Sequence, residues 1–212
     1  PHLHRARVGL LLRRPTTVED IGRVLELDPT SVEAKALEAQ LIVRHDPYLS
    51  TSTDVAERPE FADRRVERNG RSDWWAMDFT AAELRSLKAR QVFADRPQQF
   101  NDQYPILTFA DFLDFVAAEE QRCGCTIPVE PEVKLPALYA RAGLDPLPAL
   151  LAMLEARGLN AEGSAVMIQS FDPDFLKRLR PETPLPLLML YAGHDEPGAN
   201  ADGLTIEAIS EF

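Results

Sequence analysis

Three charged side chains alternate along one apolar stretch of the sequence. Residues 126–134 have the composition of a buried strand, and Glu130, Glu132 and Lys134 lie at its end. Because successive side chains of a strand point to opposite faces, these three fall on the same face. Burying charges there is costly unless they are paired or bound to an ion. A carboxylate can hold a hard divalent cation while the lysine neutralises an anionic substrate. The alternative is an internal Glu–Lys ion pair.

Two further apolar runs are each followed by polar side chains. The run 41–43 is followed by Arg44, His45 and Asp46, and the run 165–168 leads into Gln169. An imidazole titrates near neutral pH, so His45 can serve as a general acid or base. Its alternative role is a simple hydrogen bond to a loop carbonyl. Gln169 can hydrogen-bond a substrate oxygen, and it can equally bond the backbone.

The elements that would position these residues alternate between strands and helices. We expect strands at 41–43, 126–134, 165–168 and 186–190, which are apolar apart from the charged end of 126–134, as in a parallel sheet covered on both faces. The polar residues then gather at the carboxyl ends of strands, which is where TIM barrels carry active sites. The expected strands are too few for a closed (β/α)8 barrel. We therefore predict an α/β fold, an incomplete TIM (β/α)8-type barrel.

Capping patterns mark the expected helices. Thr80 with Glu83 has the capping-box spacing, and Leu84 and Leu87 then point inward. Thr108 precedes a second apolar stripe. Between these helices and His45, residues 48–78 are polar and irregular, which is typical of a functional loop or a small excursion from the fold. Asp172-Pro173 starts a third helix, over 175–179. The helix that follows Thr108 has an inward stripe of Phe109, Phe112, Leu113, Val116 and Ala117. The remaining helices are expected at 15–28, 32–39, 147–159 and 204–212, and the Thr80 helix extends to residue 90.

Composition excludes several function classes. The 212 residues contain 23 Lys and Arg against 34 Asp and Glu, a net charge of −11. Nucleic-acid and anionic-membrane binding both rest on clustered basic residues, so neither partner is expected. No apolar run is long enough for a transmembrane segment. The two cysteines, Cys123 and Cys125, are separated only by Gly124, and we predict two free thiols in a loop.

The stretch LIVRHDPYLSTSTDVA, residues 41–56, resembles the segment of glycerophosphodiester phosphodiesterases that contains their second active-site histidine. The similarity runs in order, with matching spacing, to about residue 190. It includes Glu57–Phe61, Asp78-Phe79-Thr80, Glu83-Leu84, Leu87, Tyr104-Pro105-Ile106, Thr108-Phe109, Pro131–Lys134 and Gln169–Asp172.

This resemblance implies a barrel of the phospholipase-C-like phosphodiesterase kind. It also implies hydrolysis of a small-molecule glycerophosphodiester to sn-glycerol 3-phosphate and an alcohol, with Ca²⁺ or Mg²⁺ as cofactor and two histidines as acid and base. His45 matches the second histidine and is suited to protonating the leaving alkoxide. Glu132 matches a metal-binding carboxylate, and Lys134 matches a phosphate-facing lysine.

The sequence departs from the family before residue 41. At the place of the family's Glu-x-Asp metal ligands stands Glu33-Ala34-Lys35, so Glu33 is a candidate ligand beside a lysine that would repel the cation. No apolar run precedes His4 to form the first strand, and the last strands are also missing. We therefore expect residues 1–40 to form an atypical segment and residues 41–212 a partial barrel. An inactive homologue is the alternative function, and another metal-dependent lipid phosphodiesterase is a third. The resemblance also suggests a periplasmic or secreted protein, because relatives with a similar loop are often exported.

Overall fold

The computed structural model describes residues 41–191 of the chain. The chain divides into two units between Ala39 and Gln40, and the described residues belong to the second. Helices expected at 15–28, 32–39 and 204–212 lie outside the described residues, as does Glu33. Within the described part, no helix is long and apolar enough to cross a membrane.

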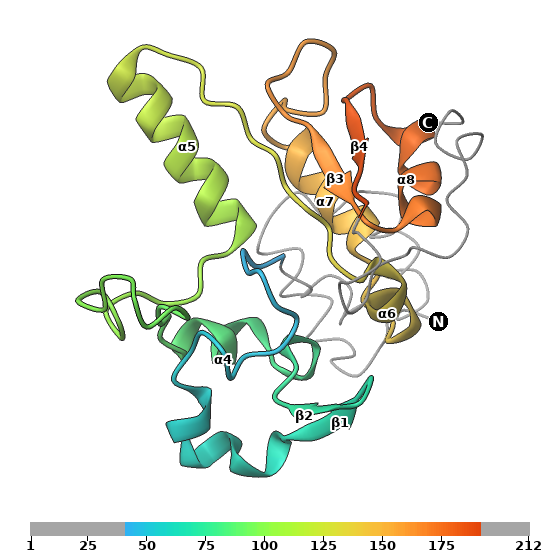
Figure 1. Ribbon diagram of the computed structural model, residues 1–212. Helices are drawn as coiled ribbons and strands as arrows, with labels where there is room; N and C mark the ends of the chain where they lie inside the picture. The colour runs from blue at the N-terminus through green and yellow to red at the C-terminus, as the bar shows by residue number, and fades with distance from the viewer. Residues whose placement is uncertain (1–40, 192–212) are drawn as a thin grey trace, which may run out of the picture. The chain divides into compact units, whose positions relative to one another are not determined.

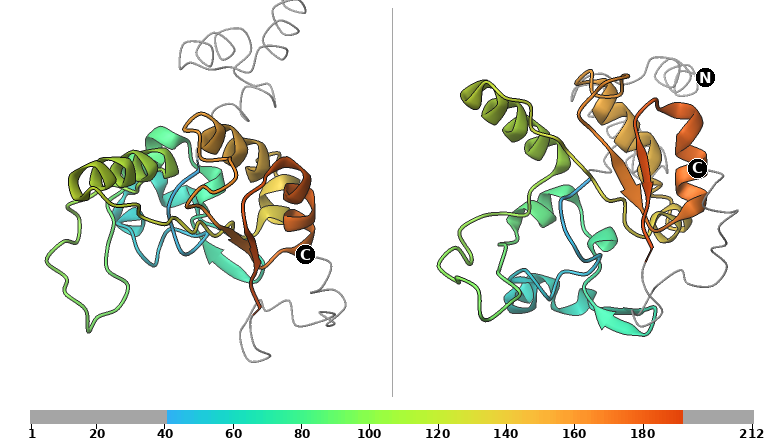
Figure 2. Two further views of the ribbon diagram at one scale, coloured as in Figure 1. Left: turned by 90° about the horizontal axis from the view of Figure 1, so that it is seen from above. Right: turned by 45° about the horizontal axis from the view of Figure 1, so that its top comes forward.

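Parallel strand pairing forms the centre of this unit. Strand β3 (Ile168–Ser170) pairs in parallel with β4 (Leu187–Met189), in the register Ile168↔Leu187. On the other edge of β3, parallel bridges join Val129 to Val166 and Glu132 to Gln169. Helix α8 (Pro173–Leu179) packs on both β3 and β4, and the strands lie side by side in every view (Figures 1 and 2).

The predicted strand 126–134 is wrong as a regular strand, because only its two bridges are present. The amide of Val129 donates to the Ala165 carbonyl and that of Val133 donates to the Gln169 carbonyl, each over 2.9 Å. The residue midway between them is Pro131, which has no N–H and can only accept, from the Gln169 amide. One donor is therefore missing from the middle of the ladder.

The expected helices are present in the described part, with different ends. Helix α4 (Ala81–Ser86) begins at the predicted Thr80–Glu83 capping box but ends before Arg90, because Lys88 and Ala89 form bridges to Pro105 and Thr53. Helix α5 (Phe109–Cys123) begins after Thr108 as predicted, although Ala117 is exposed. Helix α7 (Pro146–Glu155) is shorter than the predicted 147–159, and α8 begins after Asp172. Helix α6 (Pro136–Arg141) was not expected.

Residues 48–78 are a folded excursion and not an irregular loop. They form the 3₁₀ helices η1 (Val55–Glu57), η2 (Pro59–Arg64) and η3 (Ala76–Asp78) around an antiparallel hairpin. Its strands are β1 (Val66–Arg68) and β2 (Arg71–Asp73). Charged residues on its surface hid a buried apolar set from the sequence pattern. This excursion core consists of Leu49, Val55, Phe61, Trp74, Ala76, Phe79, Leu84, Leu87 and Ile106.

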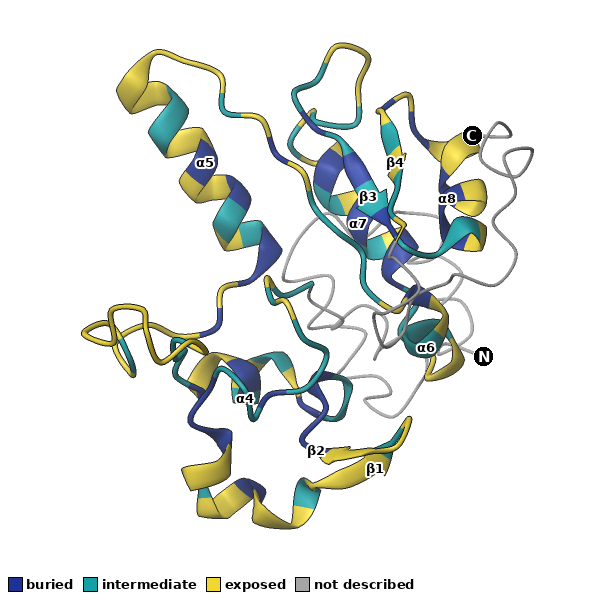
Figure 3. Ribbon diagram, viewed as in Figure 1, coloured by how far each residue is buried: buried dark blue, intermediate teal, exposed yellow. Residues whose placement is uncertain are grey.

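A second cluster, the sheet core, lies between the helices and the parallel strands. In Figure 3, α7 and α8 carry buried residues along one side and exposed residues along the other. A 3₁₀ turn, η4 (Arg180–Glu182), follows α8. The buried members of the sheet core are Phe109, Leu113, Val116, Val129, Leu147, Leu150, Leu151, Leu154, Val166, Ile168, Phe175, Leu176, Leu179 and Leu185.

The expected strand 41–43 is reduced to a single antiparallel bridge between Ile42 and Thr108. The Val43 amide donates to Leu107, and the Phe109 amide donates to Leu41, each over 2.8 Å. Leu41 packs against the sheet core and Ile42 against the excursion core. This short segment therefore touches both clusters just before the residues Arg44 and His45.

The two cysteines correct another prediction. Cys123 and Cys125 form a disulfide, with their Cα atoms 5.2 Å apart, and are not free thiols. Gly124 between them has φ +64°, a left-handed conformation that glycine adopts without a steric penalty. We predicted free thiols because the two cysteines are so close in sequence. The glycine between them, at the end of α5, makes the tight turn that lets them pair.

Candidate functional site

Strand register brings three of the predicted site residues together. The parallel bridge sets Glu132 directly beside Gln169, and Lys134 follows two residues later on the same face. The fully buried Ser170 donates its Oγ hydrogen to the Val133 carbonyl over 2.8 Å, which fixes the backbone next to Lys134. Three polar side chains therefore lie together, two from the extended segment 126–134 and one from β3.

Glu132 and Lys134 form the ion pair that the sequence offered as one of two alternatives. Lys134 Nζ lies 2.9 Å from Glu132 Oε1, and the side chains are 25% and 21% exposed. The Oε1 atom is buried and has no partner in hydrogen-bonding geometry, so the contact is one of charge alone. Glu130 is exposed, and its carbonyl accepts from Gln169 Nε2 over 3.5 Å, which is the backbone bond that the sequence offered as the alternative for Gln169. The Glu132 oxygen therefore has the Lys134 ammonium beside it but no aligned hydrogen-bond donor.

His45 follows the short bridged segment 41–43 and points into solvent. Its side chain is 86% exposed, and its Nδ1 atom lies 2.8 Å from Asp46 Oδ1. The other oxygen of Asp46 accepts from the Thr51 hydroxyl over 2.8 Å. Partial burial opposes ionisation of Asp46, but these hydrogen bonds outweigh it, so the pKa of Asp46 lies below its ordinary value. An ionised Asp46 can accept a hydrogen from Nδ1 of His45, and Nε2 then remains available for another partner.

Arg44 is a residue that the sequence argument passed over. Its Nη2 donates to the Tyr48 carbonyl over 2.8 Å and to Ser52 Oγ over 3.0 Å, which fastens the chain around His45. Burial lowers the pKa of Arg44, and burial raises that of Tyr139 on α6, where the Arg44 charge opposes the rise. The charge of Arg44 therefore acts on the helix that directly follows Lys134. The signal in the sequence was the position of Arg44 between the apolar run 41–43 and His45.

The described residues do not by themselves fit a divalent cation. Within residues 41–191 no three His, Cys, Asp or Glu side chains converge in a way that could hold a metal ion. Glu132 supplies one carboxylate, and hard cations take six or more oxygen ligands. Lys134 already occupies the vicinity of its buried oxygen.

Comparisons with known proteins agree on one family. The sequence model of the Glycerophosphoryl diester phosphodiesterase family matches residues 38–210. A Haemophilus influenzae glycerophosphodiester phosphodiesterase is 29% identical over 70% of this chain and 43% of its own length. The Arabidopsis thaliana glycerophosphodiester phosphodiesterase GDPD6 is 34% identical over 54% of this chain and 32% of its own length. A Treponema pallidum glycerophosphodiester phosphodiesterase is 30% identical over 68% of this chain and 42% of its own length.

A solved structure supports the fold. A Silicibacter pomeroyi protein assigned to the glycerophosphoryl diester phosphodiesterases superposes with a TM-score of 0.56 at 21% identity, over 80% of this chain and 57% of its own. The chain spans less than half the length of the curated relatives that it matches. The family match covers most of the chain, and β3 pairs in parallel with β4 and with the segment 126–134, as the strands of a TIM barrel do. The chain therefore belongs to the glycerophosphoryl diester phosphodiesterase family and has its TIM-barrel-like α/β fold.

Proposed function

We propose that this chain contributes to hydrolysis of a glycerophosphodiester to sn-glycerol 3-phosphate and an alcohol. The observation that carries the proposal is the juxtaposition of Glu132, Lys134 and Gln169 where the extended segment 126–134 pairs in parallel with β3. A phosphodiester is an anion, and a half-buried lysine ammonium is a suitable group to receive it. Membership of the family supports the substrate class.

The proposed roles follow from the chemistry of each side chain. Water adds to phosphorus and gives a proton up to the solvent, while the bond from phosphorus to the alcohol oxygen breaks and leaves its electron pair on that oxygen. His45, oriented through Nδ1 by Asp46, gives a proton from Nε2 to the departing alkoxide. Lys134 Nζ faces the phosphoryl oxygens and stabilises the charge that grows on them. Gln169 donates its amide N–H to a substrate oxygen, held beside Glu132 by the strand register.

The proposal includes a divalent cation, Ca²⁺ or Mg²⁺, for which Glu132 is one ligand. Such a cation would supply Lewis-acid stabilisation of the phosphoryl charge. Its support is the buried Glu132 Oε1 atom, which lacks a well-aligned donor. The candidate ligand Glu33 lies outside the described residues.

A second candidate is an inactive homologue that binds the substrate weakly or not at all. Two observations favour it: the absence of a three-ligand cluster within residues 41–191, and the 86% exposure of His45. A general acid that is so exposed is in contact with solvent, so its position does not exclude water from the reaction.

The proposed location is the periplasm or the cell exterior. The Cys123–Cys125 disulfide supports it, because disulfides persist in oxidising compartments. Fractionation of cells that express the natural gene tests this point, and recovery in the cytoplasm alone would contradict it.

The deciding experiment measures release of sn-glycerol 3-phosphate from glycerophosphocholine, with Ca²⁺, with Mg²⁺ and with a chelator. The variants are Lys134→Met, His45→Gln and, as a matched control, Lys177→Met on the exposed side of α8. Removing a charge that stabilises the transition state should lower the rate by about a hundredfold or more, whereas Lys177→Met should retain the original rate.

Each outcome assigns the chain to one candidate. Turnover that falls in Lys134→Met and His45→Gln, but not in the control, supports the hydrolase. Loss of turnover in chelator extends that support to the cation. No turnover in a chain with native circular dichroism assigns it to the inactive homologues. Equal rates in Lys134→Met and the control would refute the role given to Lys134.

A further inference from the structure

The Cys123–Cys125 disulfide lies on the surface, at the carboxyl end of α5. Both cysteines and the glycine between them are exposed, as are Gln121 and Arg122 before them. These are the only cysteines of the chain. We propose that this pair is a redox-active site that exchanges electrons with a dithiol. The inference is independent of the proposed hydrolysis.

The disulfide is poorly placed to be a structural brace. A crosslink stabilises a protein chiefly by restricting the unfolded chain, and this effect grows with the length of the loop that it closes. Here the two cysteines are separated by one residue, so the closed loop is very short. No distant parts of the fold are joined. A brace between elements would have been expected to connect α5 to another helix or strand.

Other contacts hold the same turn without the disulfide. The Gly124 amide donates to the Glu120 carbonyl over 2.9 Å and ends the helix, with Gly124 at φ +64°. The Glu120 side chain then accepts from the Ile127 amide over 2.8 Å and fixes the chain beyond the turn. The backbone of residues 120–127 is thus fastened on both sides of the two sulfur atoms. Opening the S–S bond removes none of these hydrogen bonds.

The turn also provides partners for the reduced sulfur. Cys123 Sγ lies 3.2 Å from the Cys125 amide nitrogen, which can donate to it in either redox state. It lies 3.6 Å from the carbonyl oxygens of Glu120 and Cys125. A disulfide sulfur has no hydrogen to donate, but a thiol has one, and these carbonyls can accept it. Both redox states therefore have partners in the same backbone conformation.

The exchange reaction balances with a dithiol as the only co-reactant. One thiolate of the dithiol attacks Cys123 Sγ or Cys125 Sγ, forming a mixed disulfide and releasing the other sulfur as a thiolate, which takes up a proton. The second thiol of the dithiol, losing its proton, then attacks the mixed disulfide and frees the second cysteine. The chain gains two electrons and two protons, and the dithiol becomes a disulfide. Exposed disulfides are the more easily reduced class, and both sulfur-bearing residues here are exposed.

The test measures reduction of the whole chain under native conditions. The oxidised protein is incubated with dithiothreitol, excess reagent is removed, and new thiols are alkylated and counted by mass spectrometry. We expect two alkylated thiols per chain, unchanged circular dichroism and an unchanged unfolding midpoint. Incubation with an excess of oxidised glutathione should then return the count to zero.

Single-cysteine variants complete the test. In Cys123→Ser and Cys125→Ser the remaining thiol has no internal partner, so each should form a mixed disulfide with oxidised glutathione. The proposal is overturned if thiols appear only in urea, because the pair is then a protected brace. It is equally overturned if reduction lowers the unfolding midpoint markedly, or if the oxidised treatment leaves two free thiols.

Discussion

Asp73 at the end of β2 is a buried carboxylate on which the excursion depends, and its removal should be strongly destabilising. The residue is 2% exposed. Its Oδ1 accepts from the Ser50 amide over 3.2 Å and from the Trp74 amide over 2.8 Å. Its Oδ2 accepts from Ser50 Oγ over 2.6 Å and from Arg71 Nε over 3.0 Å. Burial opposes ionisation, but these donors outweigh it and lower the pKa of Asp73.

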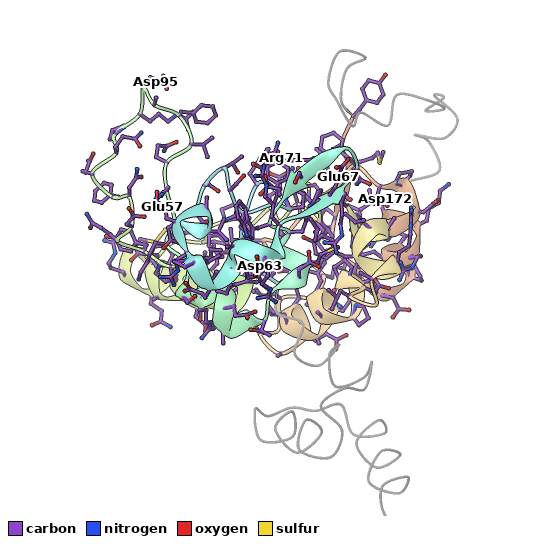
Figure 4. The ribbon with its side chains drawn as sticks, turned by 90° about the horizontal axis from the view of Figure 1, so that it is seen from below. Glu57, Asp63, Glu67, Arg71, Asp95 and Asp172 are labelled. Atoms are coloured by element: carbon purple, nitrogen blue, oxygen red, sulfur yellow. A yellow bond between two sulfur atoms is a disulfide. The ribbon has the colours of Figure 1, made fainter. Side chains whose placement is uncertain are left out.

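The magnitude of the effect of Asp73→Ala follows from the donors that lose their acceptor. The amides of Ser50 and Trp74 are left without this partner near the buried excursion core, and each buried unpaired group costs about 1 to 3 kcal/mol. We expect Asp73→Ala to lower the free energy of unfolding by roughly 2 to 5 kcal/mol. Asp63, labelled in Figure 4, is exposed, and Asp63→Ala is the matched control, expected to change stability by less than about 0.5 kcal/mol.

Urea unfolding at several pH values provides the measurement. Because the folded-state pKa of Asp73 lies below its unfolded value, its stabilising contribution is present above the unfolded pKa and is lost as the pH falls through the folded one. The difference between the original chain and Asp73→Ala should therefore be full at neutral pH and shrink below about pH 4. A difference under about 0.5 kcal/mol at neutral pH, or one that is constant down to pH 2, would refute the reasoning.

Three further predictions use the same unfolding measurement. Thr80→Ala removes the capping-box side chain of α4 and should cost about 1 kcal/mol, most of it recovered in Thr80→Ser; an unchanged midpoint would contradict the cap. Leu154→Ala, at a fully buried position in α7, should cost about 2 to 5 kcal/mol, whereas Leu188→Ala, 38% exposed, should cost clearly less. Equal losses of stability in the two variants would contradict the burial of Leu154 in the sheet core. Asp46→Asn should destabilise the chain by about 1 kcal/mol at neutral pH and by less as the pH falls through the lowered pKa of Asp46; a loss that grows in acid would reverse the assigned sign.

Local signals explain what the sequence could predict. Helix starts were correct where a capping side chain determines them: Thr80, Thr108 and Asp172 each accept a hydrogen bond from a backbone amide in the first turn. The common face of Glu132 and Lys134 was also predictable, because it follows from the alternation of side chains within one extended segment.

Features that depend on distant residues could not be predicted in this way. That Gln169 lies beside Glu132 is a matter of strand register, which no nearby residue specifies. The excursion core joins residues from Leu49 to Ile106, whose apolar members are too scattered to show a period. Helix α4 ends early because Ala89 pairs with Thr53, and this pairing overrides the helical propensity of the segment.

The Ile42–Thr108 bridge determines how the two cores can unfold. Leu41 belongs to the surroundings of the sheet core and Ile42 to those of the excursion core, and the amides of Val43 and Phe109 donate across the bridge between them. If the bridge opens, a segment that contacts both cores is released. The hydrogen bonds of these two amides therefore couple the unfolding of one core to that of the other. Hydrogen exchange at Val43 and Phe109 will therefore report the free energy at which one core can open while the other stays folded.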